Sequence, residues 1–213
     1  MPVWKKWTSE GAVWGIWRVS ESQDELRNFL KEALPYDAEL AALKSPTRRM
    51  EYLAVRVLLK ALTGQELQIA HYVSGQPYLV NDCRRISISH TKGYVAVGIH
   101  DHALPGIDIE QVSERVLKIV SRFIRLDEFV GKEQLDSQWQ LYGALLHWSA
   151  KETLFKLLET SEVDFLAHLR VSPFLPQVCG RMAVREYRTV DKQSFTLSYF
   201  VSSDFVCVWG IKA

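Results

Sequence analysis

Acidic and basic residues gather in two short segments of the chain, Gly106–Glu110 and Trp148–Lys156. The first segment alternates apolar and acidic residues, so in a strand Asp108 and Glu110 project from one face while the two isoleucines face the core. Two carboxylates on one face repel each other. A divalent cation such as magnesium, which prefers carboxylate and phosphate oxygens, converts that repulsion into binding. The segment is therefore a candidate metal site.

The second segment has the composition of a helix, in which Glu152 and Lys156 lie one turn apart on one side. It supplies a third carboxylate, and Lys151 adds a second ammonium group. Taken alone, an Asp-x-Glu strand is most often a solvated sheet face, and a Glu-Lys pair four residues apart is usually a surface ion pair of about 0.3–0.5 kcal/mol. The occurrence of both segments in one chain favours a shared site.

Candidate phosphate ligands lie upstream of the two acidic segments. Arginines suit bidentate phosphate binding, and Arg48 and Arg49 fall in a predicted helix, although a helical arginine is more often simply solvated. Ser89 and His90 end a predicted strand and could donate to a second phosphate. The chain has no P-loop, Gly-x-Gly-x-x-Gly, Gly-x-Ser-x-Gly or His-Glu-x-x-His motif. A phosphorus-centred reaction therefore fits better than glycoside hydrolysis, which paired acids alone would permit.

Composition describes a folded, charge-balanced protein. The 213 residues are 47% hydrophobic and include seven tryptophans, which is ample for a buried core. A net charge of +1 predicts no nucleic-acid or membrane partner. The three cysteines are widely spaced, which argues against a zinc site and against a disulfide framework. With no signal peptide and no long apolar run, we expect a soluble, cytoplasmic protein.

The elements that must position these residues alternate between strands and helices. In order, we expect a strand at 12–19, a helix from about 24 to 34, a helix at about 47–62 with Gly64 as its C-cap, and strands at 78–80, 85–89 and 94–99. The last two of these strands form a hairpin through residues 91–93.

The second half of the chain echoes the first. Trp14–Arg18 resembles Pro105–Ile109, Leu58–Lys60 resembles Leu154–Lys156, and Tyr94–Ile99 resembles Phe205–Ile211, in the same order. Such short matches can arise by chance or by duplication. Duplication predicts an α+β fold of two similar half-domains, 1–104 and 105–213, related by a pseudo-twofold. Each would be a small, mostly antiparallel sheet packed on a long helix, with the acidic strand at the seam, a usual location for small-molecule sites.

These motifs together resemble the 4′-phosphopantetheinyl transferase superfamily, in its larger, pseudodimeric bacterial type. Gly106–Glu110 is similar to the family's Gly-Ile/Val-Asp-x-Glu signature, and Trp148–Lys156 to its Trp-Ser-x-Lys-Glu signature, with Thr153 in place of a small residue. Weaker likenesses, in the family's order, are Arg48–Leu59, Gly75–Pro77, Ser87–Thr91, and Arg122-Phe123 followed by Glu128.

The resemblance implies Mg2+-dependent transfer of the phosphopantetheine arm of coenzyme A to a serine of an apo acyl or peptidyl carrier protein, with release of 3′,5′-ADP. It implies a metal site of Asp108, Glu110 and Glu152, with Lys156 on the phosphates and the neighbouring Lys151 as a second candidate. Glu152 is also the expected base for the carrier serine. By the same resemblance, the expected ligands of the coenzyme A 3′-phosphate are Arg48, Arg49, Ser89 and His90.

One departure from the family lies at Gln76, where members often have a cation for the 3′-phosphate. An uncharged amide cannot form an ion pair, so we expect weaker discrimination against dephospho-coenzyme A. The segment Val112–Phe129 alternates apolar and basic residues, including Arg115, Lys118 and Arg122. It is a candidate docking surface for an acidic carrier, or else an ordinary core-packed helix with a solvated basic face.

Two rival functions stay open at this point. One is a non-catalytic coenzyme A or carrier-binding module of the same fold, and the other is a metal-dependent phosphodiesterase. The sequence leaves open whether the carrier belongs to fatty acid biosynthesis or to polyketide or peptide synthesis. An internal duplication would make a monomer sufficient.

Overall fold

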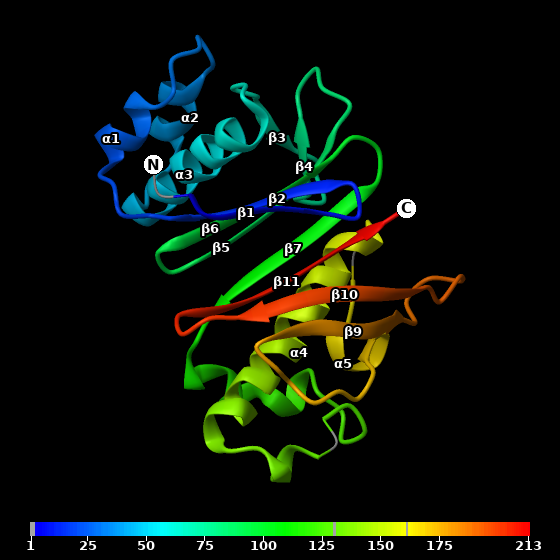
Figure 1. Ribbon diagram of the computed structural model, residues 1–213. Helices are drawn as coiled ribbons and strands as arrows, with labels where there is room; N and C mark the ends of the chain where they lie inside the picture. Colours follow the sequence, from blue (N-terminus) through cyan, green and yellow to red (C-terminus); the bar gives the residue numbers. More distant parts are fainter. Residues whose placement is uncertain (1–2, 130, 161) are drawn as a thin grey trace. The chain divides into compact units, whose positions relative to one another are not determined.

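The structure, a computed structural model, describes residues 3–129, 131–160 and 162–213. The chain divides into two compact units, Met1–Ala103 and Leu104–Ala213, called here the N-terminal and C-terminal units. Each unit has a largely antiparallel sheet and one long helix (Figure 1). This confirms the predicted α+β class, whereas the pseudo-twofold stays a prediction.

The N-terminal unit is built on a four-stranded sheet in the order β1-β2-β6-β5, with every pair antiparallel. A separate two-stranded ribbon joins β3 and β4. The elements are β1 (Val3–Ser9), β2 (Ala12–Arg18), α1 (Gln23–Asn28), α2 (Tyr36–Ala42), α3 (Pro46–Thr63), β3 (Ile69–His71), β4 (Pro77–Leu79), β5 (Arg85–Thr91) and β6 (Tyr94–His100).

Helix α3 has clear start and stop signals. The Ser45 side chain accepts a hydrogen bond from the Arg48 backbone N–H, Pro46 follows at the first helical position, and Gly64 ends the helix in the left-handed region at φ +78°. The helix passes close to β2, because a Cβ on Gly15 would lie 2.7 Å from a Leu62 methyl carbon. The predicted helix at 47–62 is confirmed to within one residue at each end.

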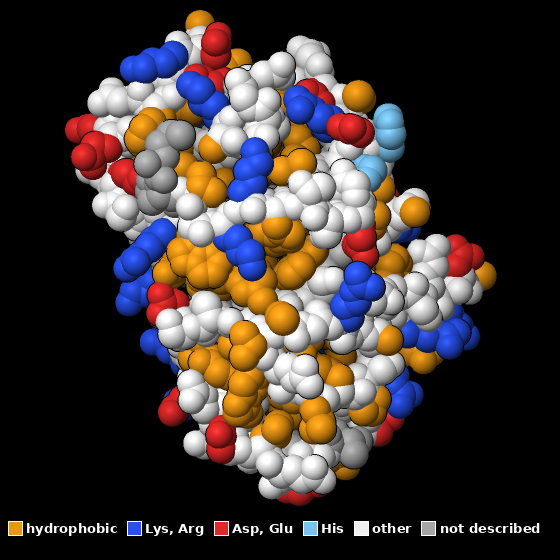
Figure 2. Space-filling model, viewed as in Figure 1, with side chains coloured by type: hydrophobic (Ala, Val, Ile, Leu, Met, Phe, Trp, Pro, Cys, Tyr) orange, Lys and Arg blue, Asp and Glu red, His pale blue; other side chains and the backbone are white. Residues whose placement is uncertain are grey.

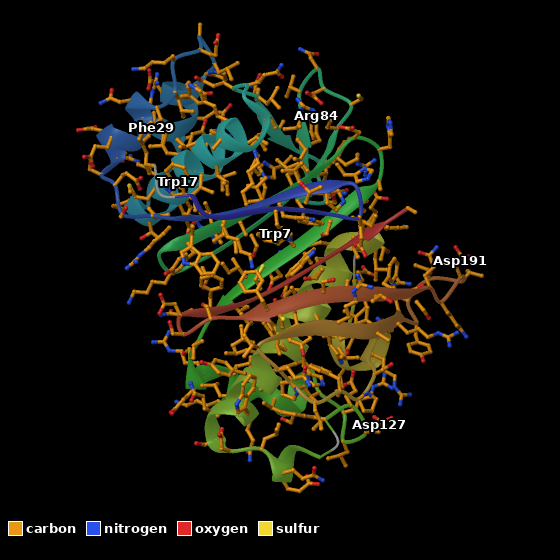
Figure 3. All side chains as sticks on the ribbon, in the orientation of Figure 1. Trp7, Trp17, Phe29, Arg84, Asp127 and Asp191 are labelled. Carbon is orange, nitrogen blue, oxygen red and sulfur yellow. The ribbon has the colours of Figure 1, made fainter. Side chains whose placement is uncertain are left out.

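The helix predicted from 24 to 34 is shorter than expected and ends at Asn28. The cause lies outside its local sequence. The backbone N–H groups of Lys31 and Glu32 donate to the Glu66 carboxylate at 2.7 and 3.0 Å, which draws the chain out of the helix. Phe29, at the helix end, packs edge-on against Trp17 of β2 with ring centroids 6.2 Å apart (Figure 3).

The C-terminal unit is built on a five-stranded sheet in the order β7-β11-β10-β9-β8. In Figure 1 its long helix α4 runs along one face of this sheet. The elements are β7 (Leu104–Gln111), the 3-10 helices η1 (Glu114–Arg122) and η2 (Lys132–Gln134), α4 (Ser137–Leu158), α5 (Phe165–His168), β8 (Leu169–Val171), β9 (Cys179–Glu186), β10 (Ser194–Val201) and β11 (Phe205–Lys212).

The pairing of β7 with β11 decides which way the acidic residues point. Asp108 lies opposite Val208 and Glu110 opposite Val206, and both valines belong to the buried cluster that packs around α4. Directly paired residues share a face, so the two carboxylates face α4. The prediction that Ile107 and Ile109 face the core is confirmed, because both are buried, although neither belongs to the cluster around α4.

The sequence echoes fall on elements with the same connections. Strands β2, β6 and β5 adjoin in that order in one sheet, as β7, β11 and β10 do in the other. Gly106 corresponds to Gly15. Like Gly15, it lies close to a helix, because a Cβ added to Gly106 would be 3.0 Å from both the Leu157 side chain and the Thr153 carbonyl oxygen of α4. The shared order favours duplication over chance, and duplication itself stays a prediction.

Three properties of the described residues bear on the functional classes. Cys83, Cys179 and Cys207 are free thiols. No helix in the described part of the chain is long and apolar enough to cross a membrane. On the face shown in Figure 2, lysine and arginine side chains are scattered among acidic ones, as the near-zero net charge leads us to expect.

Candidate functional site

The acidic site of the C-terminal unit lies between β7 and α4. Asp108 is 4% exposed, and its Oδ1 atom accepts a 2.8 Å hydrogen bond from Lys156 Nζ. Glu110 accepts a 2.9 Å bond from the Trp148 indole N–H. Each strand carboxylate is therefore held by a residue of the second signature, so the structure brings the two segments together.

Burial and mutual repulsion shift the acidity of this cluster. Burial, followed by the charge of Asp108, raises the pKa of Glu110 to about 7, against the lowering effect of the Trp148 hydrogen bond. The same two causes raise the pKa of Glu152 to about 6, against the lowering effect of Lys156. Raised carboxyl pKa values mean that the ionised forms of these side chains are destabilised by burial and by their mutual repulsion. A bound cation would stabilise the ionised forms.

Lys156 is the cation that already touches the cluster. Its ammonium donates to the Ile107 carbonyl as well as to Asp108, at 2.8 Å each, and its side chain stays 25% exposed. The Ile107 carbonyl is neutral, so it positions the Lys156 ammonium without neutralising its positive charge. Lys156 is therefore placed to meet an anion that approaches Asp108.

A metal site needs ligands that converge. Among residues 3–129, 131–160 and 162–213, no three His, Cys, Asp or Glu side chains come close enough together to hold a metal ion as they stand. The donor set still suits a hard cation, because Asp108, Glu110 and Glu152 are carboxylates whose charges act on one another. Coordination would require their side chains to turn inward, and the magnesium site stays a prediction.

The structure argues against the predicted phosphate-binding role of Lys151. Both Lys151 and Glu128 are fully buried, and the ammonium lies 2.8 Å from the Glu128 carboxylate. The same ammonium also donates to the carbonyl oxygens of Phe123 and Phe165. All of its donors are used inside the unit, so we do not assign Lys151 to a phosphate.

In the N-terminal unit, α3 and β5 bring together two of the predicted 3′-phosphate ligands. The Arg48 guanidinium lies 2.9 Å from His90 Nε2. Glu51 adjoins both residues, 3.2 Å from Arg48 Nη1 and 3.5 Å from His90 Nδ1. Glu51 falls in the family likeness over Arg48–Leu59 but was given no role, although its position three residues after Arg48 on a helix is the spacing that predicts contact.

The other predicted 3′-phosphate ligands are placed differently. Ser89 is buried and adjoins His90 on β5, so the two side chains project from opposite faces of the strand. Arg49 Nε donates to the Leu43 carbonyl at 2.7 Å. Gln76 lies between β3 and β4, where its carbonyl accepts from the Tyr72 N–H. Of these predicted ligands, Arg48 and His90 are in direct contact.

Comparison with known proteins identifies the C-terminal unit. Residues 105–208 match the family model of the 4′-phosphopantetheinyl transferase superfamily. The C-terminal unit matches this superfamily over nearly its whole length. It is also 30% identical over 84 residues to "4′-phosphopantetheinyl transferase gsp" of Aneurinibacillus migulanus, a match that covers 39% of this chain and 35% of that relative. The chain thus spans about a third of the length of the curated relative that it matches.

The superfamily match begins one residue after the start of β7 and ends within β11. It therefore contains Asp108, Glu110, Glu152 and Lys156, the residues whose contacts define the acidic site. Arg48 and His90 lie outside it. The superfamily match thus covers the acidic site, whereas the predicted phosphate ligands of the N-terminal unit rest on the sequence resemblance and on local geometry.

The basic segment of the C-terminal unit differs from a regular α-helix. Residues Glu114–Arg122 form a 3-10 helix, with Val116 buried and Arg115, Lys118 and Arg122 exposed. At three residues per turn, Arg115 and Lys118 lie on the same face. Leu117, between them, is 46% exposed. The segment is anchored to the core by Val116 and presents its cations to solvent.

Proposed function

We propose that this protein transfers the 4′-phosphopantetheine arm of coenzyme A to a serine hydroxyl of an apo carrier protein and releases 3′,5′-ADP. The observation that supports this most is the contact of Lys156 with Asp108, beside Glu110 and Glu152, in a unit that matches the transferase superfamily. Three carboxylates and one ammonium suit a magnesium-bound pyrophosphate.

Magnesium held by Asp108, Glu110 and Glu152 would neutralise charge on the pyrophosphate, as in other phosphoryl-transfer sites. Residues of the chain would bind and orient the substrate and the carboxylates. Lys156, fixed by the Ile107 carbonyl, binds a phosphate oxygen beside Asp108. Trp148 holds Glu110 by its indole N–H, which sets the direction in which the carboxylate points.

The reaction forms one oxygen–phosphorus bond and breaks another. The serine oxygen attacks the phosphorus that carries the pantetheine arm, and the pyrophosphate oxygen that joins it to the nucleotide leaves on 3′,5′-ADP. The serine proton passes to a Glu152 oxygen, directly or through water. With a pKa of about 6, Glu152 is ionised at pH 7 and basic enough to accept this proton. If Glu152 also held magnesium, one of its oxygens would serve the metal and the other would take the proton.

The acidity of the carboxylates predicts how magnesium binding depends on pH. Glu110 and Glu152, with pKa values of about 7 and 6, hold protons at pH 5.5 and lose them by pH 8. Magnesium binds only the deprotonated form, so its affinity should rise about tenfold or more over this interval, with proton release. Titration calorimetry in buffers of different ionisation enthalpy measures both quantities. An affinity that does not change with pH would contradict the assignment.

We propose the 3-10 segment as the docking surface for the carrier, because Arg115, Lys118 and Arg122 are exposed beside the exposed Leu117. Such a surface complements the acidic carriers that the resemblance implies. Changing Arg115 and Lys118 together to glutamate should raise the carrier KM about tenfold or more and leave the coenzyme A KM unchanged.

Steady-state kinetics with each substrate varied in turn measures this effect. The matched control reverses Arg181 and Arg185, two exposed arginines of β9, and should leave both KM values unchanged. An unaltered carrier KM in the Arg115/Lys118 variant would show that the segment is an ordinary packed helix with a solvated face.

The nucleotide product separates the proposed transferase from its rivals. Coenzyme A and magnesium are incubated with the protein, with and without an apo carrier, and the nucleotides are resolved by chromatography. The proposal predicts 3′,5′-ADP only when the carrier is present. Release without carrier would indicate a phosphodiesterase, and no release in either case a non-catalytic binding module. Cytoplasmic location and a monomeric state also stay proposals.

A further inference from the structure

Glu51 lies between the two side chains that we assign to the 3′-phosphate of coenzyme A. Its carboxylate is 3.2 Å from Arg48 and 3.5 Å from His90, and its side chain is 20% exposed, against 61% for Arg48. The contacts join one turn of α3 to the end of β5, all within the N-terminal unit. The Glu51 carboxylate therefore lies within the proposed binding site of the 3′-phosphate.

The Arg48 guanidinium already has an acidic partner. Arg48 has only donors, so in the 2.9 Å contact with His90 it donates to Nε2. The same guanidinium lies 3.2 Å from the Glu51 carboxylate, which offsets its positive charge. A phosphate arriving at Arg48 therefore meets a guanidinium that is already paired with a carboxylate.

Two other predicted ligands of the 3′-phosphate add little that is specific to it. Gln76, at the position where family members often have a cation, is uncharged. Arg49 keeps its positive charge, but its Nε atom is used by the Leu43 carbonyl. Binding of a 3′-phosphate therefore has to compete with Glu51 for the Arg48 guanidinium.

We propose that Glu51 is a specificity-determining residue that weakens recognition of the 3′-phosphate, so that the enzyme uses coenzyme A and dephospho-coenzyme A with similar efficiency. The inference rests on the proposed transfer function. Repulsion between the Glu51 carboxylate and a phosphate in this partly exposed site, together with competition for one guanidinium, corresponds to about a fivefold effect.

The test is the Glu51→Gln variant, which keeps the shape and removes the charge. With an apo carrier as acceptor, kcat/KM is measured for coenzyme A and for dephospho-coenzyme A. We expect the ratio of the two values to rise about fivefold, through a lower KM for coenzyme A. The KM for dephospho-coenzyme A should not change, whereas damage to the fold would alter both substrates alike.

Asp37→Asn is the matched control, since it removes one negative charge from α2 of the same unit, where the carboxylate pairs with Arg27. Its ratio should equal that of the unmodified protein. An unchanged or lower ratio in Glu51→Gln, with transfer intact, would overturn the inference alone. Absence of transfer by the unmodified protein with either substrate would instead overturn the proposed function on which the inference depends.

Discussion

Replacing Asp108 with alanine is expected to lower magnesium-dependent transfer at least roughly 100-fold. Asp108 is nearly buried, contacts Lys156, and repels both Glu110 and Glu152. Its removal would therefore take away a metal ligand and release the ammonium that it positions. The kcat for transfer, measured over a range of magnesium concentrations, gives the effect.

The fold should survive this substitution. Alanine removes the buried charge that raises the pKa of both neighbouring glutamates, so we expect the free energy of unfolding to change by about 1 kcal/mol or less. Asp191→Ala, in the exposed connection between β9 and β10 (Figure 3), is the matched control and should transfer normally. Full magnesium-dependent activity in Asp108→Ala would refute the proposed metal site.

The second large effect concerns stability. Replacing Lys151 with methionine should lower the free energy of unfolding by about 3–5 kcal/mol, because it leaves the fully buried Glu128 carboxylate without its counter-ion. Glu128 cannot turn to solvent, since it also accepts hydrogen bonds from the backbone N–H groups of Arg125 and Val171 at 2.7 Å each. Denaturant unfolding monitored by tryptophan fluorescence measures the loss.

Two further variants separate the buried pair from a general effect of losing charge. Adding Glu128→Gln to Lys151→Met should cost less than the sum of the two single changes, with a coupling energy of about 1–3 kcal/mol. Arg170→Met breaks the exposed pair with Asp127, the neighbour of Glu128, and should cost about 1 kcal/mol or less. Equal losses for Arg170→Met and Lys151→Met would contradict the account.

The elements that were predicted correctly have their sequence signals within or next to the element itself. Helix α3 was predicted from apolar spacing and its glycine C-cap, and the hairpin of β5 and β6 from alternation on either side of a short turn. Asp108 and Glu110 were placed on one face because a strand has a period of two. These inferences needed no knowledge of the rest of the chain.

The errors arose where distant residues decide the outcome. The end of α1 is set by Glu66, more than 30 residues away, and the burial of Lys151 by a carboxylate 23 residues earlier. The early likeness to Arg-Phe followed by Glu had marked Glu128, but nothing in its spacing showed that it would pair with Lys151. Ser89 and His90 were grouped by resemblance to the family; they project from opposite faces of β5, and their shared role stays a prediction.

The most direct test of the proposed transfer is the intact mass of a carrier protein. An apo acyl carrier protein is incubated with this protein, coenzyme A and magnesium, and is then weighed by mass spectrometry. The account predicts that the carrier gains the mass of one phosphopantetheine group on its serine, and that the gain disappears with Asp108→Ala or with a chelator. An unmodified carrier in the complete reaction, with the protein folded and coenzyme A bound, would contradict it.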